Sequence, residues 1–202
     1  MKQFLKLTCC LILLMFLAAC GEKTTETMYL APAELTKEEQ GMLDLLEVTP
    51  DQFLIYDFSL EDGIEKLEVN LYELEDGSWK PLISGGQPFE DTQGRIALSF
   101  TKLTQGLKVG VQSEHQNGAT AYTRNPEEDE ESSGCATVKL SEKKQVAWDE
   151  EIPLVVQVMT AKNEIYTYSP DAYFHPEDYA KHGYDHVFAI TVRFSQTPLS
   201  SE

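Results

Sequence analysis

The chain has 202 residues, 42% of them hydrophobic, which is enough for one folded domain with a proper core. Its 34 acidic and 16 basic residues give a formal net charge of −18. This charge argues against nucleic acid as a partner, because such binding needs Lys and Arg to neutralise phosphates. It favours cationic partners and predicts repulsion from anionic lipid head groups.

The N-terminus has the layout of an export signal. A basic hexapeptide precedes an apolar run over residues 7–16, and small residues then lead into Cys20. The sequence Leu17-Ala18-Ala19-Cys20-Gly21 resembles the lipobox of bacterial lipoproteins. The resemblance implies that the thiol of Cys20 carries a diacylglyceryl group and that the new amino group is open to acylation, for example with palmitate. It places the protein on the extracytoplasmic face of a cell membrane.

The alternative is an uncleaved membrane anchor. The apolar run from residue 7 to residue 20 has only 14 residues, whereas a spanning helix needs about 20. Lipidation is therefore favoured, with residues 1–19 as the signal peptide. Because Lys2 and Lys6 leave with it, 183 residues with a formal charge of −20 remain.

We expect a lipidated spacer over residues 20–35, a folded domain over 36–195 and a C-terminal tail over 196–202. Thr36 and Glu39 form a capping box that predicts a short helix over residues 36–46. Its apolar positions are Met42, Leu43, Leu45 and Leu46. We expect this face to pack on the domain, with a partner-binding helix as the rival interpretation.

From Gln52 onward the apolar residues alternate with polar ones, which is typical of half-buried strands. Two Glu-Asp-Gly turns, at 61–63 and 75–77, predict a meander of antiparallel strands. Further strands are expected near 79–83, 96–100, 107–111, 119–124, 136–140, 146–148, 164–168 and 187–194. Residues 152–159 are apolar on both faces apart from Gln157, which predicts a central strand covered on both sides.

Nine or ten strands with only short helices predict an all-β fold. The expected architecture is an antiparallel β-sandwich of immunoglobulin-like type with a helical turn near 176–182, and a β-barrel is the runner-up. Residues 36–195 also resemble the globular part of uncharacterised small lipoproteins of Gram-positive bacteria. The resemblance rests on Leu43-Asp44-Leu45-Leu46, the 72–79 hairpin and Ile152-Pro153-Leu154-Val155-Val156. It implies an exported single domain and no known activity.

Residues 166–188 contain seven of the chain's 20 aromatic residues. Tyr166, Tyr168, Tyr173 and Tyr184 form the candidate binding surface, since tyrosine rings stack on sugars or fill partner pockets. The alternative is that Phe174 and Phe188 lie in the core while the tyrosines only cover an edge.

Metal binding is a weaker hypothesis. The candidate ligands are His175, Glu177, Asp178, His182, Asp185 and His186. Gly183 breaks the helical spacing between His182 and His186, and His182 has a sufficient role beside a helix C-terminus. The acidic run 127–131 lacks the ligand pattern of a calcium loop and indicates a solvated loop. No metal and no cofactor is therefore expected.

Cys135 is the one cysteine left after lipidation of Cys20 and loss of the leader, so no intrachain disulfide is expected. We expect it to be a small buried hydrophobe in a strand, rather than a reactive thiol.

Signature motifs of enzymes, such as Gly-x-Ser-x-Gly, His-Glu-x-x-His and Cys-x-x-Cys, do not occur. The sequence favours a membrane-anchored, non-catalytic binding module whose ligand is an unknown protein or carbohydrate. The first alternative is a surface hydrolase acting on glycans or cell wall, which needs two carboxylates in a cleft. The second is a metal-binding lipoprotein.

Overall fold

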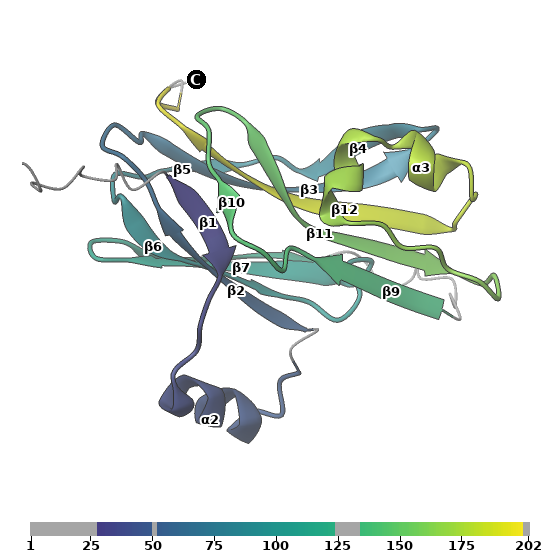
Figure 1. Cartoon of the computed structure of the whole chain (residues 1–202), viewed down its shortest axis with the longest axis horizontal. Helices are drawn as coiled ribbons and strands as arrows, with labels where there is room; N and C mark the ends of the chain where they lie inside the picture. The colour runs from purple at the N-terminus through teal and green to yellow at the C-terminus, as the bar shows by residue number, and fades with distance from the viewer. Residues whose placement is uncertain (1–27, 50–51, 124–133, 200–202) are drawn as a thin grey trace, which may run out of the picture.

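The computed structural model describes residues 28–49, 52–123 and 134–199. Two antiparallel six-stranded sheets pack face to face, accompanied by few and short helices (Figure 1). The first sheet has the order β10 (Lys144–Gln145), β1 (Tyr29–Pro32), β2 (Phe53–Ser59), β6 (Gln93–Ser99), β7 (Gly106–Ser113) and β8 (Asn117–Thr123). The second has the order β4 (Ser78–Ile83), β3 (Lys66–Glu75), β12 (His186–Ser195), β11 (Glu151–Thr160) and β9 (Gly134–Lys139), and β5 (Gly86–Pro88) also pairs with β3.

This arrangement confirms the expected mostly-β fold of two packed sheets. The barrel alternative is wrong, because no strand pairing within the described ranges joins the two sheets. Each sheet instead buries its inner face on the other, as one-sided strands require.

The core lies between the sheets and follows the alternation of the sequence. Leu54, Tyr56 and Phe58 of β2 point inward, and the Phe58 ring lies 5.3 Å from that of Phe194 on β12. The hydroxyl of Tyr56 donates to the Leu154 carbonyl oxygen at 3.3 Å across the core. The inward side chains of β2 thus hold the two sheets together through packing. The polar atom among them, the Tyr56 hydroxyl oxygen, has a hydrogen-bond partner.

Strand β11 is covered on both faces, as predicted, and residues 152–160 are all buried. One face meets the main core, whereas Val156 and Val158 meet a second cluster with Tyr179 outside the sheet. The second cluster is supplied by a 3-10 helix, η2 (Pro170–Phe174), and by α3 (Glu177–Ala180), which cover this sheet in Figure 1. The predicted helical turn near 176–182 is confirmed by α3.

The turn at 75–77 forms the expected β3–β4 hairpin, with Asp76 and Gly77 both at positive φ. The pairing of β3 with β4 also shows a register shift between Leu71 and Tyr72, as a β-bulge produces. The turn at 61–63 is different. It carries the chain from β2 in the first sheet to β3 in the second, so the predicted meander is wrong at this point.

Helix α2 (Lys37–Leu45) begins at Thr36 with the predicted capping box. The expected packing of its apolar face is wrong, since Met42, Leu45 and Leu46 are 62%, 78% and 66% exposed. Figure 1 shows the helix standing off the first sheet. An ion pair between Glu39 and Arg95 of β6 ties its first turn to the sheet. Local capping therefore forms this helix, without burial of its apolar side.

Three further segments differ from expectation. The strand expected near 146–148 is wrong, because the strand in this region is β10 and it ends at Gln145. Residues 29–32, expected in the spacer, form β1 and pair with both β2 and β10. Residues 164–168, expected as a strand, pair with no strand of the described chain and form an irregular segment over the second sheet.

Cys20, the leader and the acidic run 127–131 lie outside the described residues. Of the helices that are described, none has the length and apolar character needed to cross a membrane.

Candidate functional site

The aromatic segment lies on the outer face of the second sheet, over β11 and β12. Tyr179 of α3 is fully buried there against Val156 and Val158, and it fixes the segment to the sheet. The Tyr168 ring meets the Tyr179 ring edge to face at 5.1 Å. These contacts anchor the segment to the second sheet, so that the rings farther from the sheet can hold a defined arrangement.

Four side chains form what we call the ring cluster, namely Tyr166, Tyr168, His182 and Tyr184. The His182 imidazole stacks on the Tyr166 ring at 4.9 Å and on the Tyr184 ring at 5.2 Å, with planes inclined by 16° and 22°. Gly183 adopts a φ of +56°, a conformation that favours glycine, in the turn between His182 and Tyr184.

Hydrogen bonds hold the rings in place. The Tyr166 backbone N–H donates to the Tyr184 hydroxyl at 2.7 Å, and the Tyr168 hydroxyl lies 2.9 Å from His182 Nε2. The Lys162 ammonium donates to the His182 carbonyl oxygen. The Lys181 ammonium lies 5.3 Å from the centre of the Tyr168 ring, within the range of a cation–π contact. The cluster is thus organised by its own contacts.

The structure brings three of the four predicted tyrosines together at the surface. Tyr166 is 53% exposed, while Tyr168 and Tyr184 are half-buried. The prediction is wrong for Tyr173, which is buried in η2 and whose ring stacks on Trp79 at 5.3 Å. Phe174, expected in the core as one alternative, is 55% exposed, whereas Phe188 is fully buried as expected.

Tyr173 belongs instead to a polar network centred on Glu151 of β11. The Tyr72 hydroxyl donates to Glu151 Oε1 at 2.6 Å and the Tyr173 hydroxyl donates to Oε2. Asn70 and Thr191 donate to Oε1 at 3.2 and 3.1 Å. Burial and the nearby carboxylate raise the pKa of Tyr72 to about 12 and that of Tyr173 as well. Both hydroxyls therefore stay protonated as donors, and the network has a structural role.

The candidate histidine ligands do not converge. His186 Nδ1 lies 2.7 Å from Glu73, His175 Nδ1 lies 3.6 Å from Glu177, and His182 is stacked between tyrosines. Across residues 28–49, 52–123 and 134–199, no group of three or more His, Cys, Asp or Glu side chains is placed to hold a metal ion. His182 directly follows Lys181, the C-cap of α3, and its ring stacks on the tyrosines of the ring cluster.

Cys135 lies in β9, as expected for a strand residue, but it is exposed rather than buried. Its side chain is on an edge strand that pairs on one side with β11. Partial burial raises the pKa of the Cys135 thiol. The expectation of a buried residue is therefore wrong, and a raised pKa disfavours the reactive thiolate.

Two carboxyl groups with lowered pKa values, Asp91 and Glu68, do not have the property needed in the general acid of a hydrolase. Hydrogen bonds from Ser113 and His115 lower the pKa of Asp91 to about 2. Burial acts to raise the pKa of Glu68, but the hydrogen bond and charge of Arg193 outweigh it and lower that pKa. A glycosidase acid needs a raised pKa, so neither group fits that role.

The fold and the ring cluster define a two-sheet β-sandwich with an organised aromatic surface on one outer face. No protein-family model, no curated protein and no solved structure matches the chain. Sequence reasoning missed His182 as the central ring of the cluster. Its position two residues before Tyr184, across a glycine, was the available signal.

Proposed function

We propose that this protein is a lipid-anchored, extracytoplasmic binding module without catalytic activity. Lipid on Cys20 would hold it at the cell membrane, and the ring cluster would contact a protein or carbohydrate ligand. The lipobox sequence supports the anchor. Two or more acyl chains provide stable attachment to a bilayer, whereas a single chain binds only marginally.

The observation that carries the binding role is the ring of Tyr166. It is 53% exposed although His182 covers one of its faces. Its backbone N–H is fixed by Tyr184, and its own hydroxyl donates to Glu164 at 2.9 Å. A ring already held in one orientation loses little conformational entropy when it binds. Flat, amphipathic tyrosine rings are the side chains that dominate many binding surfaces.

We further propose that the sandwich is of immunoglobulin-like type. The support is that the chain passes between the two sheets several times, for example from β2 to β3 and from β5 to β6. Such crossings between packed sheets are typical of Greek-key sandwiches.

Site-specific photo-crosslinking of the full chain in intact cells tests the binding role. A benzophenone amino acid replaces Tyr166 in one strain and Phe174 in another. Phe174 is the matched control, because it is 55% exposed but lies outside the ring cluster. We expect a covalent adduct from position 166 at a yield at least fivefold above that from position 174.

A further variant distinguishes contact at the ring cluster from non-specific crosslinking. Tyr184→Ala removes a ring of the cluster and should reduce the adduct formed from position 166. Equal adduct yields at 166 and 174, or no adduct at 166, would refute the proposed surface. Mass spectrometry of the adduct distinguishes a captured peptide from a captured sugar.

A further inference from the structure

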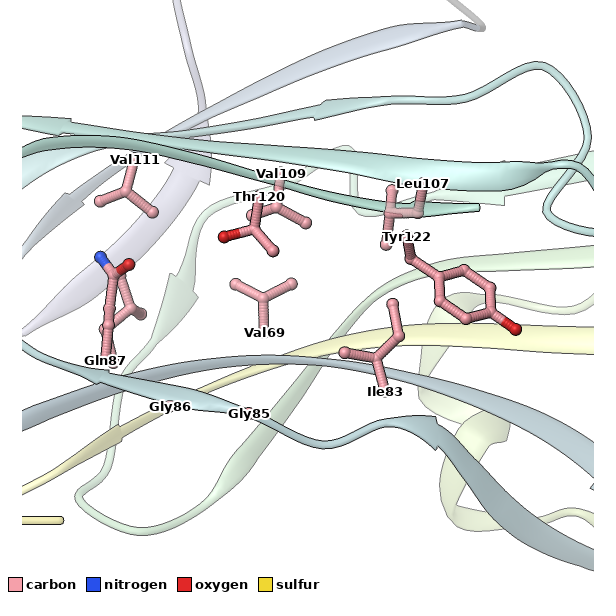
Figure 2. A pocket seen from close by; sticks show the side chains of 11 residues that line it. Val69, Ile83, Gly85, Gly86, Gln87, Leu107, Val109, Val111, Thr120 and Tyr122 are labelled. Atoms are coloured by element: carbon pink, nitrogen blue, oxygen red, sulfur yellow. The ribbon is translucent and has the colours of Figure 1, made fainter. Parts of the chain in front are cut away.

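The two sheets separate along one edge of the sandwich, between β8 and the β4–β5 segment. Val69 on β3 and Val109 on β7 both face inward, yet both stay only partly buried. Figure 2 shows their side chains pointing toward each other across a space between the sheets. This space is a cavity of about 210 Å³. The opposite edge differs, since Leu140 and Val146, on either side of β10, fill it as core residues.

Most of the cavity wall is aliphatic. The lining residues with apolar side chains are Leu67, Val69, Ile83, Leu107, Val109 and Val111. Gly85 lies between β4 and β5 and Gly86 begins β5, so two adjacent lining residues carry no side chain (Figure 2). A Cβ built on Gly85 would meet no atom within 4 Å. At Gly85, therefore, no side chain closes the edge of the cavity.

Three polar side chains complete the lining, namely Gln87, Thr120 and Tyr122. Figure 2 places the Gln87 amide next to Val111, while the Tyr122 ring stands at the far end beside Leu107 and Ile83. Within the described parts of the chain, these three side chains make no hydrogen bond to another protein group. No lining residue carries a charge.

We propose that this cavity binds a small uncharged amphiphile with a compact hydrocarbon body and one hydroxyl, amide or ester group. The cavity volume limits the size of the ligand's hydrocarbon part, because a protein cavity of about 150 Å³ accommodates benzene. A cavity of about 210 Å³ thus accepts a substituted ring or a chain of about six to eight carbons. The aliphatic wall takes the hydrocarbon, and Gln87 or Thr120 pairs with the polar group.

Because no charged side chain lines the cavity, we expect the ligand to be uncharged. A buried ion without a partner is strongly disfavoured, and the acidic chain as a whole repels carboxylates. An alcohol, amide or ester of this size satisfies both conditions. This site is separate from the ring cluster, which lies on the outer face of the second sheet, so the two proposals can fail independently.

Photolabelling of the full chain in intact cells tests the proposal. The probe is an eight-carbon alcohol carrying a diazirine, and octan-1-ol is the competitor. We expect adducts on peptides that contain β3 and β7, and we expect excess octan-1-ol to reduce them at least fivefold. Label on the same peptides that does not saturate would indicate partition into lipid and would overturn the proposal. So would the absence of label from β3 and β7.

Two variants fill the cavity from opposite sheets. Val69→Phe and Val109→Phe should each lower the competed label at least fivefold. Gly41→Leu on α2 is the control, because a Cβ at Gly41 meets no atom within 4 Å and no residue of α2 lines the cavity. Unchanged labelling in a folded filling variant would refute the site. If both variants fail to fold, saturation by octan-1-ol in the unaltered chain still decides.

Discussion

The hydroxyl of Tyr173 donates to the carboxylate of Glu151, and this bond removes Tyr173 from the surface that the sequence assigned to it. Glu151 accepts from four side chains, Asn70, Tyr72, Tyr173 and Thr191, which belong to β3, η2 and β12. One carboxylate on β11 therefore links two neighbouring strands and the covering helix.

Glu151→Ala should destabilise the protein by about 3 kcal/mol, because several partly buried donors lose their acceptor at once. Glu150→Ala, at the adjacent and exposed position, should change stability by less than about 0.5 kcal/mol. Urea denaturation of both variants measures the difference. Equal effects at the two positions would mean that the network does not hold η2 against the sheet.

The ring cluster predicts a modest stability effect at His182. His182→Ala removes two ring stacks, and stacked aromatic pairs contribute about 0.5–1.5 kcal/mol each. We expect a loss of about 1–3 kcal/mol by chemical denaturation, the sum for the two stacks. His175→Ala is the control, since the His175 side chain is largely exposed and its ion pair with Glu177 is long, at 3.6 Å. A loss from His175→Ala as large as that from His182→Ala would contradict this assignment.

The exposed face of α2 predicts unusual tolerance to polar substitution. Leu45→Ser should change the free energy of unfolding by less than about 0.5 kcal/mol, because Leu45 is 78% exposed. Leu71→Ala, in the centre of the core, should cost about 2–5 kcal/mol. Thermal and urea unfolding measure both. A cost above about 2 kcal/mol for Leu45→Ser would place the helix against the domain in solution.

Asp91 and His115 predict a pH window for stability. The lowered pKa of Asp91 means that its contribution is present above about 3.8 and is lost as the pH falls toward about 2. The raised pKa of His115, caused first by its hydrogen bond to Asp91, means that its contribution is full below about 6.5. It is lost as the pH rises through the raised pKa.

Asp91→Asn should weaken the pH dependence of the free energy of unfolding in both the acid and the neutral range. His115→Ala should weaken it only in the neutral range. The reason is that Ser113 still donates to Asp91 at 2.6 Å in the His115 variant. Denaturation series from pH 2 to pH 8 test this. Unaltered acid sensitivity in Asp91→Asn would show that other carboxyl groups control the acid limb.

Thiol counting tests the lipobox and the exposure of Cys135 together. A lipidated, processed chain should react with a water-soluble maleimide at one thiol, Cys135, without denaturant. An unprocessed, unmodified chain has four cysteines in all. Mass spectrometry of the labelled protein gives the count directly. More than one labelled thiol after denaturation would contradict a chain that is both lipidated at Cys20 and cleaved before it.

The sequence by itself determined the local features of this protein. Alternation in β2, the Asp76-Gly77 hairpin and the capping box of Thr36 all depend on neighbours within a few residues. The continuous apolar run of β11 also showed that both its faces are covered, since exposed strands alternate.

Only the tertiary structure decided which surfaces meet. The turn at 61–63 leads to another sheet, the apolar face of α2 stays exposed, Tyr173 turns to Glu151 and His182 enters the ring cluster. Val69 and Val109 have the pattern of ordinary core residues but line a cavity. The physical reason is that periodicity marks which side of a strand or helix is apolar. What covers that side is set by contacts between segments distant in the chain.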